Sequence, residues 1–477
     1  MRFITILVAA LALIAAPSHA RQVWSDAHVE ELADALAEAW THGLDPDHYA
    51  DPEALLSLAP GEARDIAARE AFLTYAAHLA FGRIDPRDLE PDWTAPVRDR
   101  DLEADLARAL ENADVFAVLE GLSPAHPDYL ALRRELIRLN AVRREYTPVP
   151  TGPILEEGDE GERVDALRTR LAEEGLFTGA IAPGAAFDTR LRTALVRYQA
   201  RHNLAADGRA GPDTIRELNT SSQQRLDQVR ANLERWRWVP RDLGARHIRV
   251  NLADYRLEAW EDGEIARVHR SMIGRGFNRT PVFSEVMTFI EINPVWYTPM
   301  SLGEPWLRRF RTNPAYALAS GFRLVDMATG GVVNPSDADW ANRRYRVIQL
   351  PGAGNSMGEV KFMFPNIHNI YIHDTPERAL FDQVQRNASS GCVRVEDPRD
   401  LAWWVISREE GWTRETMEEA FDNGRTRRIW LRHTIPVHIL YFTAVSNRFG
   451  HVRYLHDVYR RDGALIAALD GPVGEPS

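Results

Sequence analysis

Hydrophobic side chains in the first third of the chain recur every three or four residues. Val29, Leu32 and Leu36 share one helical face, and mostly polar residues fill the positions between them. The same spacing recurs in three further segments, at 70–79, 102–119 and 129–139. A break containing glycine and proline at 82–86 interrupts the pattern. We therefore predict a helical scaffold domain over residues 21–150, and it holds no candidate catalytic cluster.

A proline-rich linker at 146–153 ends this region. Three short amphipathic segments follow within residues 154–222, and glycine-containing turns separate them. Val164, Leu167 and Leu171 mark one face of the first segment. The pattern predicts that residues 154–222 fold as a compact bundle of three helices, which would be a domain of its own.

From residue 246 the hydrophobic period changes to two, and a hairpin signal stands at Asp262-Gly263. Strands are predicted at 248–252, 256–260, 286–293, 370–373 and 437–442, and helices at 397–406 and 414–421. These elements predict a β-rich domain over residues 246–435 and a C-terminal segment at 436–477 whose last residues are frayed. The fold class expected for the whole chain is therefore multidomain α+β.

Residues 300–345 interrupt the strand pattern of the β-rich domain. The segment is rich in tryptophan, proline and asparagine, and its periodicity is weak. Long irregular insertions in compact domains are usually functional or disordered. We predict that this insertion is a mobile cap, or lid, over the cleft of the domain. The alternative is a fixed subdomain with no part in the chemistry.

Composition and charge exclude few classes of protein. A chain of 477 residues is long enough for two to four domains, and an apolar fraction of 45% is ordinary for globular proteins. The net charge of −12 argues against a general nucleic-acid binder, which would carry a basic surface. We expect no cofactor and no metal site, because there is one cysteine and the histidines lack ligand spacing.

Residues 1–20 have the pattern of a secretory signal peptide. Arg2 supplies the positive charge, an apolar stretch follows it, and small residues leading to Ala20 suit cleavage there. The stretch is short for a bilayer span, so the alternative is an uncleaved N-terminal anchor. We expect export of the protein, which would be peripheral to the membrane at most.

The single cysteine, Cys392, is an odd count for an exported protein. Such proteins usually pair their cysteines or lack them, because a lone thiol is open to oxidation. A retained thiol suggests that its chemistry is used, and a histidine elsewhere in the chain is the expected partner. The alternative is a buried, inert cysteine that packs as a small hydrophobe.

His373 stands at the end of a predicted strand, 19 positions before Cys392. A histidine beside a thiol lowers the thiol pKa and stabilises a thiolate–imidazolium pair. Gly391 allows a close backbone approach, so the N–H groups of Gly391 and Cys392 are candidates for an oxyanion hole. Arg394 has the planar fork that suits a carboxylate. The pattern favours a cysteine nucleophile with a histidine base.

Residues 364–395 resemble the catalytic centre of the L,D-transpeptidases, with their YkuD-like domain. The resemblance rests on Phe-Pro-Asn at 364–366, Ile-Tyr-Ile-His-Asp-Thr-Pro at 370–376 and Ser-Ser-Gly-Cys-Val-Arg-Val at 389–395. Residues 160–218 look like a peptidoglycan-binding module. With the run Asn-Leu-Glu-Arg-Trp-Arg-Trp at 232–238 and the helical N-terminal part, the chain resembles the large multidomain Gram-negative type.

The resemblance implies a periplasmic enzyme that acts on peptidoglycan stem peptides. Cys392 would attack the carbonyl between the L-centre of diaminopimelate and the terminal D-alanine of a tetrapeptide stem, and His373 would protonate the leaving D-alanine. The side-chain amine of a second stem would then attack the thioester and form a 3→3 cross-link. Water as acceptor would give an L,D-carboxypeptidase. The resemblance also implies carbapenem sensitivity and other cell-wall synthases as partners.

One position departs from the family pattern. Ser390 stands where a histidine usually precedes the glycine, which leaves the third catalytic group open. The candidate substrate-binding residues are Arg394, Tyr371, Lys361 and Ser390. Tyr371 shares a strand face with His373 and is a candidate to line the substrate site, but a packing role explains its position equally well. Lys361 is the only lysine, and it either meets a stem carboxylate or is a solvated charge. The rival hypothesis is a wall-binding scaffold whose catalytic domain has decayed.

Overall fold

The computed structural model describes residues 23–91, 93–94, 99–112, 114–142, 145–202 and 204–472. The predicted signal peptide therefore lies outside the described residues. The chain folds into two compact units. The first comprises the described residues of Met1–Trp40, Asp45–Ala80 and Asp99–Ser123, and the second comprises those of Thr41–Leu44, Phe81–Arg98 and Pro124–Ser477. Within the described ranges, no helix is both long enough and apolar enough to cross a membrane.

The first unit is helical, as the sequence predicts. Its elements are α1 (Asp26–Ala37), η2 (Pro46–His48), α2 (Pro52–Ser57), α3 (Glu62–Phe81), α5 (Leu102–Asn112) and α6 (Val115–Glu120), with η1 (Ala39–His42) at its border. Its buried residues include Trp24, Leu32 and Phe72. The predicted segment 102–119 is two helices, because Asp114 caps the second by accepting a hydrogen bond from the Ala117 N–H.

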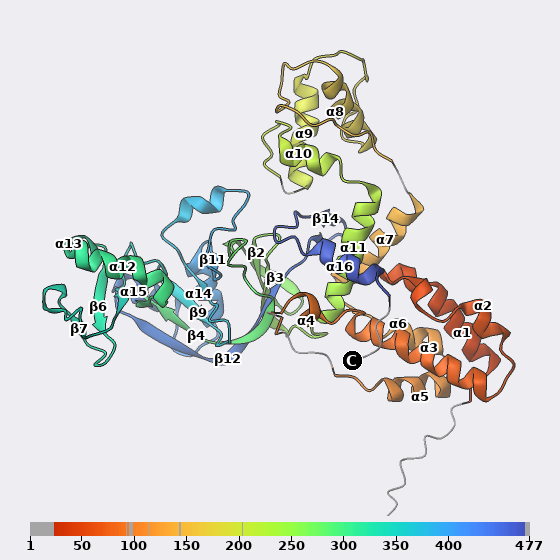
Figure 1. The fold of residues 1–477 in the computed structure, drawn as a ribbon, viewed down its shortest axis with the longest axis horizontal. Helices are drawn as coiled ribbons and strands as arrows, with labels where there is room; N and C mark the ends of the chain where they lie inside the picture. The colour runs from red at the N-terminus through yellow and green to blue at the C-terminus, as the bar shows by residue number, and fades with distance from the viewer. Residues whose placement is uncertain are drawn as a thin grey trace, which may run out of the picture. The chain divides into compact units, whose positions relative to one another are not determined.

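The second unit begins with α4 (Pro86–Leu89) and α7 (Pro127–Ala141), followed by a bundle of three helices. These are α8 (Glu162–Glu173), α9 (Thr189–Arg201) and α10 (Pro212–Leu218), which confirms the predicted helical bundle. Val164, Leu167 and Leu195 are fully buried in its core. The bundle is the yellow-green body in Figure 1.

The sequence pattern did not predict helix α11 (Ser222–Trp238), which follows the bundle directly. Its last two turns bury charged side chains among apolar ones, so the helical period of hydrophobic residues is hidden. Glu234 and Arg237 are 0% and 1% exposed and form an ion pair of 2.5 Å. Arg237 also donates to the carbonyl of His42. Paired in this way, the two charges are tolerated inside the unit.

A closed barrel of eight strands forms the centre of the second unit (Figure 1). The strands are β1 (Arg246–Asn251), β2 (Arg256–Glu261), β3 (Glu264–Met272), β4 (Phe283–Ile292), β9 (Val360–Met363), β10 (Ile372–His373), β11 (Val393–Val395) and β12 (Arg427–Leu440). They are ordered β1-β12-β4-β9-β10-β11-β3-β2. The predicted hairpin is present, with Asp262 and Gly263 at φ of 50° and 85° between β2 and β3.

Two helices and the barrel strands share one hydrophobic core. The helices are α14 (Pro398–Ile406) and α15 (Arg414–Asp422), as predicted, and η4 (Arg378–Asp382) precedes them. Ile290, Phe362, Ile372 and Val393 are completely buried in this core. Because these four point into the barrel, their neighbours along each strand point to its outer face. The β-rich C-terminal part and the helical parts before it confirm the α+β fold class.

The predicted cap insertion contains regular structure with a core of its own. Its elements are β5 (Trp296–Tyr297), α12 (Met300–Thr312), α13 (Pro314–Ala319), β6 (Phe322–Asp326), β7 (Val332–Val333), η3 (Pro335–Asp337) and β8 (Tyr345–Gln349). The strands form a sheet in the order β5-β8-β6-β7. Phe310, Phe322 and Val347 are buried between the sheet and the helices. The segment is thus a folded body, and its role as a lid stays a prediction.

The C-terminal segment is folded through residue 470, contrary to the predicted fraying of its last residues, of which 473–477 lie outside the described residues. Residues 444–470 form β13 (Ala444–Ser446), β14 (Val452–Tyr454) and α16 (Asp462–Asp470). Asp462 of α16 pairs with Arg235 of α11 at 2.6 Å and accepts a hydrogen bond from Thr443. Tyr459 is 1% exposed and its ring stacks on Tyr441. Strand β12 runs unbroken through residue 436, so it joins this segment to the barrel.

The buried pair on α11 gives a stability prediction. Arg237→Ala should lower the free energy of unfolding by about 3–5 kcal/mol, because Glu234 would remain buried and unpaired. The matched control is Arg432→Ala, whose partner Glu410 is exposed, and it should cost about 1 kcal/mol or less. Urea unfolding followed by tryptophan fluorescence measures both. Equal losses of unfolding free energy in the two variants would contradict the burial of the Glu234–Arg237 pair.

Candidate functional site

The site is built on the pairing of β10 with β11. The two strands run parallel, and Ile372 pairs with Val393 while His373 pairs with Arg394. Since Ile372 and Val393 point into the barrel, His373 and Arg394 point to its outer face. Cys392 lies two residues before Arg394, on that same face. The register therefore brings the predicted nucleophile and the predicted base to one surface.

The Cys392 thiol is half-buried, and the residue directly precedes β11. Burial raises the pKa of the Cys392 thiol above its ordinary value. Hydrogen bonds from Tyr371 oppose this shift, as do the charges of Arg394 and Lys361. The Val393 N–H donates to the Tyr371 carbonyl at 3.2 Å, which fixes the strand end beside the thiol. The resting sulfur is therefore protonated at neutral pH.

His373 is 2% exposed, and its protonation is set by its surroundings. Its Nδ1 lies 2.5 Å from the Asp374 carbonyl, which accepts only, so Nδ1 carries the proton and Nε2 is the free base. Burial, together with the charges of Arg394 and Lys361, lowers the pKa of His373 to about 3. The imidazole is neutral at any physiological pH.

The expected thiolate–imidazolium pair is not the resting state. Burial penalises the charged form of both groups, so Cys392 keeps its proton and His373 stays neutral. Among the described residues, no hydrogen bond joins the thiol to the imidazole. Activation of an uncharged pair requires general-base catalysis, in which the proton leaves the sulfur only as the sulfur attacks, and the lowered pKa of His373 makes it a weak base for this transfer.

The loop before Cys392 is held by hydrogen bonds at the Gly391 N–H and at the Cys392 carbonyl. The Ser389 hydroxyl donates to the Cys392 carbonyl at 2.6 Å and accepts from the Gly391 N–H at 3.1 Å. Gly391 has φ of 121°, which favours glycine. Its N–H is thus already bonded within the loop. In the described part of the chain the Cys392 N–H has no partner, so it is the available donor for an oxyanion.

Two residues that sequence reasoning missed orient this loop from elsewhere in the chain. The Thr280 hydroxyl donates to the Gly391 carbonyl at 2.8 Å and accepts from the Gly274 N–H at 2.9 Å. The Tyr459 hydroxyl accepts from the Thr280 N–H at 3.2 Å and donates to the Gly274 carbonyl at 2.7 Å. No sequence signal identifies either residue, because both contacts are long-range.

Tyr371 connects the candidate site to the cap. Its ring lies 5.6 Å from that of His373, and it contacts both the barrel core and the cap core. Its hydroxyl lies 3.3 Å from the Met357 sulfur, and Lys361 Nζ lies 5.0 Å from the ring centre. Tyr371 therefore packs against both cores and lies beside the thiol, and its contact with a substrate stays a prediction.

The other predicted substrate-binding residues differ in their availability. Lys361 Nζ lies 3.8 Å from the Glu291 carboxylate, and burial lowers the pKa of Lys361. Arg394 donates to Glu377 at 2.5 Å, so its fork is partly occupied. Ser390 is exposed beside the thiol, and its neighbour Ser389 makes the contacts that hold the loop.

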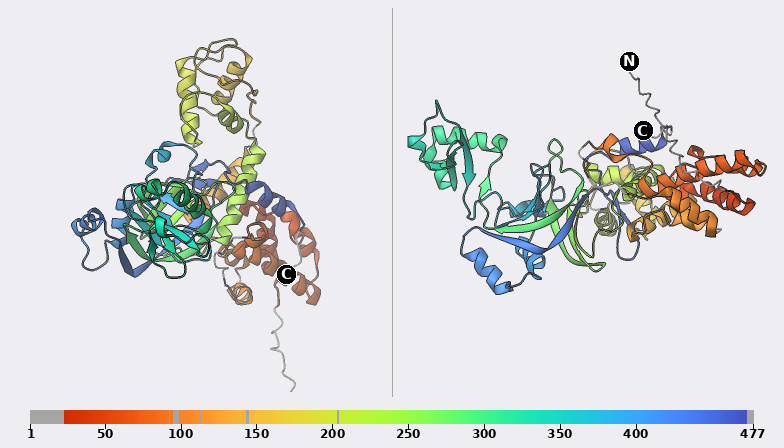
Figure 2. Two further views of the ribbon diagram at one scale, coloured as in Figure 1. Left: turned by 60° about the vertical axis from the view of Figure 1, so that its left-hand side comes forward. Right: turned by 90° about the horizontal axis from the view of Figure 1, so that it is seen from below.

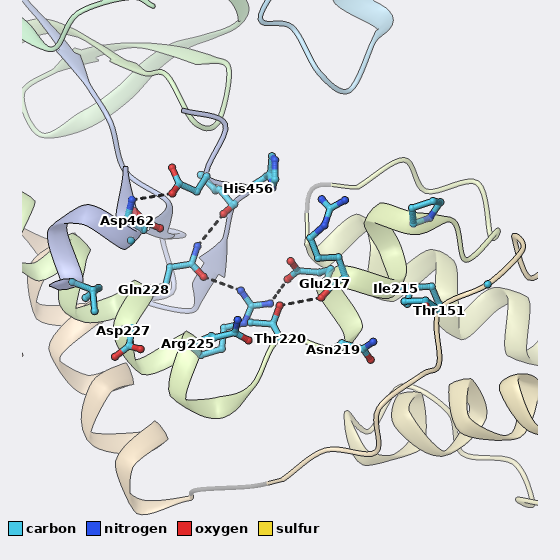
Figure 3. A pocket seen from close by; sticks show the side chains of 18 residues that line it. Thr151, Ile215, Glu217, Asn219, Thr220, Arg225, Asp227, Gln228, His456 and Asp462 are labelled. Atoms are coloured by element: carbon cyan, nitrogen blue, oxygen red, sulfur yellow. Dashed lines mark hydrogen bonds and ion pairs between the residues drawn. The ribbon is translucent and has the colours of Figure 1, made fainter. Parts of the chain in front are cut away.

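A concavity of about 870 Å³ lies away from the β10–β11 pair in the second unit (Figure 3). It is lined by residues of α10, α11 and α16. Its polar groups bind one another: Arg225 pairs with Glu217 and donates to Gln228, which in turn donates to the Leu455 carbonyl. Neither Cys392 nor His373 lines this cavity, so the candidate chemistry belongs to the barrel face.

Comparison with known families assigns three parts of the chain. Residues 245–417 match the model described as an L,D-transpeptidase catalytic domain, and this match includes every candidate site residue. Residues 160–218 match the "Putative peptidoglycan binding domain", and residues 16–136 match the "Scaffold domain".

A curated relative from Haemophilus influenzae, named "Putative L,D-transpeptidase", is 32% identical over 277 residues. The match covers 56% of this chain and 55% of the relative, so the chain spans about half the length of the curated relative it matches. Among solved structures, an L,D-transpeptidase from Stackebrandtia nassauensis is 13% identical with a TM-score of 0.24, covering 64% of this chain and 100% of that one. LdtMt1 in complex with imipenem is 12% identical with a TM-score of 0.20, covering 41% and 59%.

The uncharged resting pair predicts how thiol reactivity depends on pH. Alkylation of Cys392 by iodoacetamide should rise with pH through an apparent pKa above the ordinary thiol value of about 8.5. Because Cys392 is the only cysteine, intact-protein mass reports it directly. His373→Ala should keep the shape of this profile. A reactive plateau below pH 7 that His373→Ala removes would instead show a resting ion pair.

Proposed function

We propose that this chain, which carries a catalytic domain of the L,D-transpeptidase family with a peptidoglycan-binding domain and a scaffold domain, forms 3→3 cross-links in peptidoglycan. The observation that carries the proposal is the shared outer face of Cys392 and His373, set by the β10–β11 register inside the segment that matches the family. The substrates would be tetrapeptide stems ending in D-alanine.

In the first step Cys392 is the nucleophile and His373 is the base. The thiol proton passes to Nε2 of His373 as the sulfur attacks the carbonyl between diaminopimelate and the terminal D-alanine. The Cys392 N–H donates to the developing oxyanion. The carbon–nitrogen bond then breaks, D-alanine leaves with the proton held by His373, and the stem remains bound as a thioester.

In the second step the side-chain amine of another stem's diaminopimelate attacks the thioester. His373 takes a proton from the amine, the carbon–sulfur bond breaks, and the Cys392 thiol is restored. Water in place of the amine would release a tripeptide, which is L,D-carboxypeptidase activity. The folded cap has a core against which Tyr371 packs beside the thiol, and this contact supports a lid that excludes water during transfer.

The remaining parts of the chain fit work at the cell wall. We propose residues 154–222 as the wall-binding domain, residues 246–435 as the catalytic domain and residues 21–150 as the scaffold domain. The scaffold would position the enzyme or contact other cell-wall synthases. The signal-peptide pattern at 1–20 supports export to the periplasm. Arg394, Tyr371, Lys361 and Ser390 stay candidates for contacts with the stem.

The central test is the product made by a variant without the thiol. Wild-type protein incubated with disaccharide-tetrapeptides should give 3→3 linked dimers, identified by mass fragmentation, and Cys392→Ala should give none. The variant should unfold at the wild-type temperature, which shows that the loss is chemical. Dimers from folded Cys392→Ala would remove the thiol from the mechanism, and a wild type that makes neither dimer nor tripeptide would support the decayed-scaffold hypothesis.

Thr280 gives a second test, through the geometry of the peptide group that joins Gly391 to Cys392. A peptide group is planar and trans, so its carbonyl and its N–H point in opposite directions. Thr280 holds the Gly391 carbonyl and thereby aims the Cys392 N–H towards the oxyanion position. Thr280→Val should therefore slow acylation by a carbapenem about 10- to 100-fold. This slowing is no larger than the effect of removing an oxyanion donor outright.

Alkylation of the Cys392 thiol is the control reaction for the Thr280 variants. Iodoacetamide reacts with the sulfur without forming an oxyanion, so its rate should be nearly the same in Thr280→Val and wild type. Thr280→Ser keeps the hydroxyl and should recover most of the acylation rate. Equal slowing of both reactions in Thr280→Val would show that the residue only keeps the thiol in place, contrary to an orienting role.

A further inference from the structure

Two parallel rows of side chains cross the outer face of the barrel from β12 to β11. The register of β12, β4, β9, β10 and β11 defines the first row, and the second follows where the period of two is continued by one residue before β10 and β11. The first is a row of polar residues: Arg428, Glu291, Lys361, His373 and Arg394. The second lies two residues away along each strand and consists of Trp430, Phe289, Met363, Tyr371 and Cys392. The candidate nucleophile is therefore the last member of a mainly apolar stripe whose other end is Trp430.

Trp430 is exposed at the end of the stripe that is remote from the thiol. It is 62% exposed although Phe289, its cross-strand partner, is only 9% exposed. The two ring centres lie 4.6 Å apart, and the Arg428 guanidinium lies 4.5 Å and 5.7 Å from the centres of Phe289 and Trp430. Together they form a supported aromatic surface on the long β4–β12 ribbon seen in Figure 2.

Positive charge accompanies the stripe. Glu291 lies between two cations, with Arg428 at 3.0 Å and Lys361 at 3.8 Å from its carboxylate oxygens. The row beside the stripe thus carries more positive than negative charge between Trp430 and the thiol. An elongated ligand with carboxylates along it and an apolar face at one end would complement this surface.

The length of the stripe points to the ligand. Four strand spacings of about 4.8 Å separate β12 from β11, so Trp430 lies roughly 19 Å from Cys392 across the sheet. From the attacked carbonyl, three stem residues and the lactyl group extend about 14 Å at roughly 3.5 Å per residue. The sugar that bears the stem would begin there, and its ring would span most of the remaining distance of about 5 Å to Trp430.

We propose that Trp430, Phe289 and Arg428 form a subsite for the sugar of the glycan strand that carries the donor stem, and this rests on the proposed function. The C–H face of a sugar ring would pack on the exposed indole, and Arg428 would meet a stem carboxylate. The stripe then holds the stem extended between the subsite and the thiol. The chain would favour donors that still carry their sugars.

The test compares two donors that differ only in the sugars. D-alanine release is measured as kcat/KM for a disaccharide-tetrapeptide and for the free tetrapeptide. Wild type should prefer the disaccharide donor, and Trp430→Ala should lower this preference about tenfold, the scale of one good aromatic contact. Trp430→Phe keeps a ring and should retain most of it. Carbapenem acylation of Cys392 in each variant confirms a folded site.

Phe449→Ala is the matched control, since Phe449 is 69% exposed on the connection between β13 and β14. It should leave the preference for the disaccharide unchanged. A wild type without this preference, or a Trp430→Ala variant that keeps it, would overturn the proposal and leave the proposed cross-linking in place. A wild type that releases D-alanine from neither donor would instead count against the proposed function itself.

Discussion

The parallel pairing of β10 with β11 is the constraint on which the site depends. Two residues of β10 and three of β11 suffice, because the closed barrel fixes both strands between β9 and β3. Side chains alternate with a period of two, so a slip of one residue would turn Cys392 into the barrel and bring Val393 to the surface. The correct register gives the thiol, the imidazole and Tyr371 one common face.

Burial of this face decides the chemistry that it supports. A buried neutral imidazole and a half-buried neutral thiol avoid the cost of isolated charges, and the Asp374 carbonyl fixes which imidazole nitrogen carries the proton. In the proposed mechanism, charge develops only during attack. The loop bonds from Ser389 and Thr280 already orient the peptide group that would stabilise that charge, so little reorganisation accompanies the reaction.

Local sequence signals predicted the histidine–cysteine motif within the segment that matches the family, the three-helix bundle and most barrel strands, because each depends on a short motif or a regular hydrophobic period. Helix α11 escaped prediction because its buried Glu234 and Arg237 break that period. The folded C-terminus was not predicted, because its stability comes from contacts with α11 and the barrel, which are distant in the sequence. Thr280 and Tyr459 could not be found, since their bonds join positions 111 and 185 residues apart.

The most direct test of the account is the location of the acyl group during turnover. Wild-type protein is mixed with a disaccharide-tetrapeptide in the absence of an acceptor, quenched rapidly in acid, digested and mapped by mass spectrometry. The account predicts a thioester of the stem, less its D-alanine, on the peptide that contains Cys392. D-alanine release with Cys392 unmodified, or with the acyl group on another residue, would contradict it.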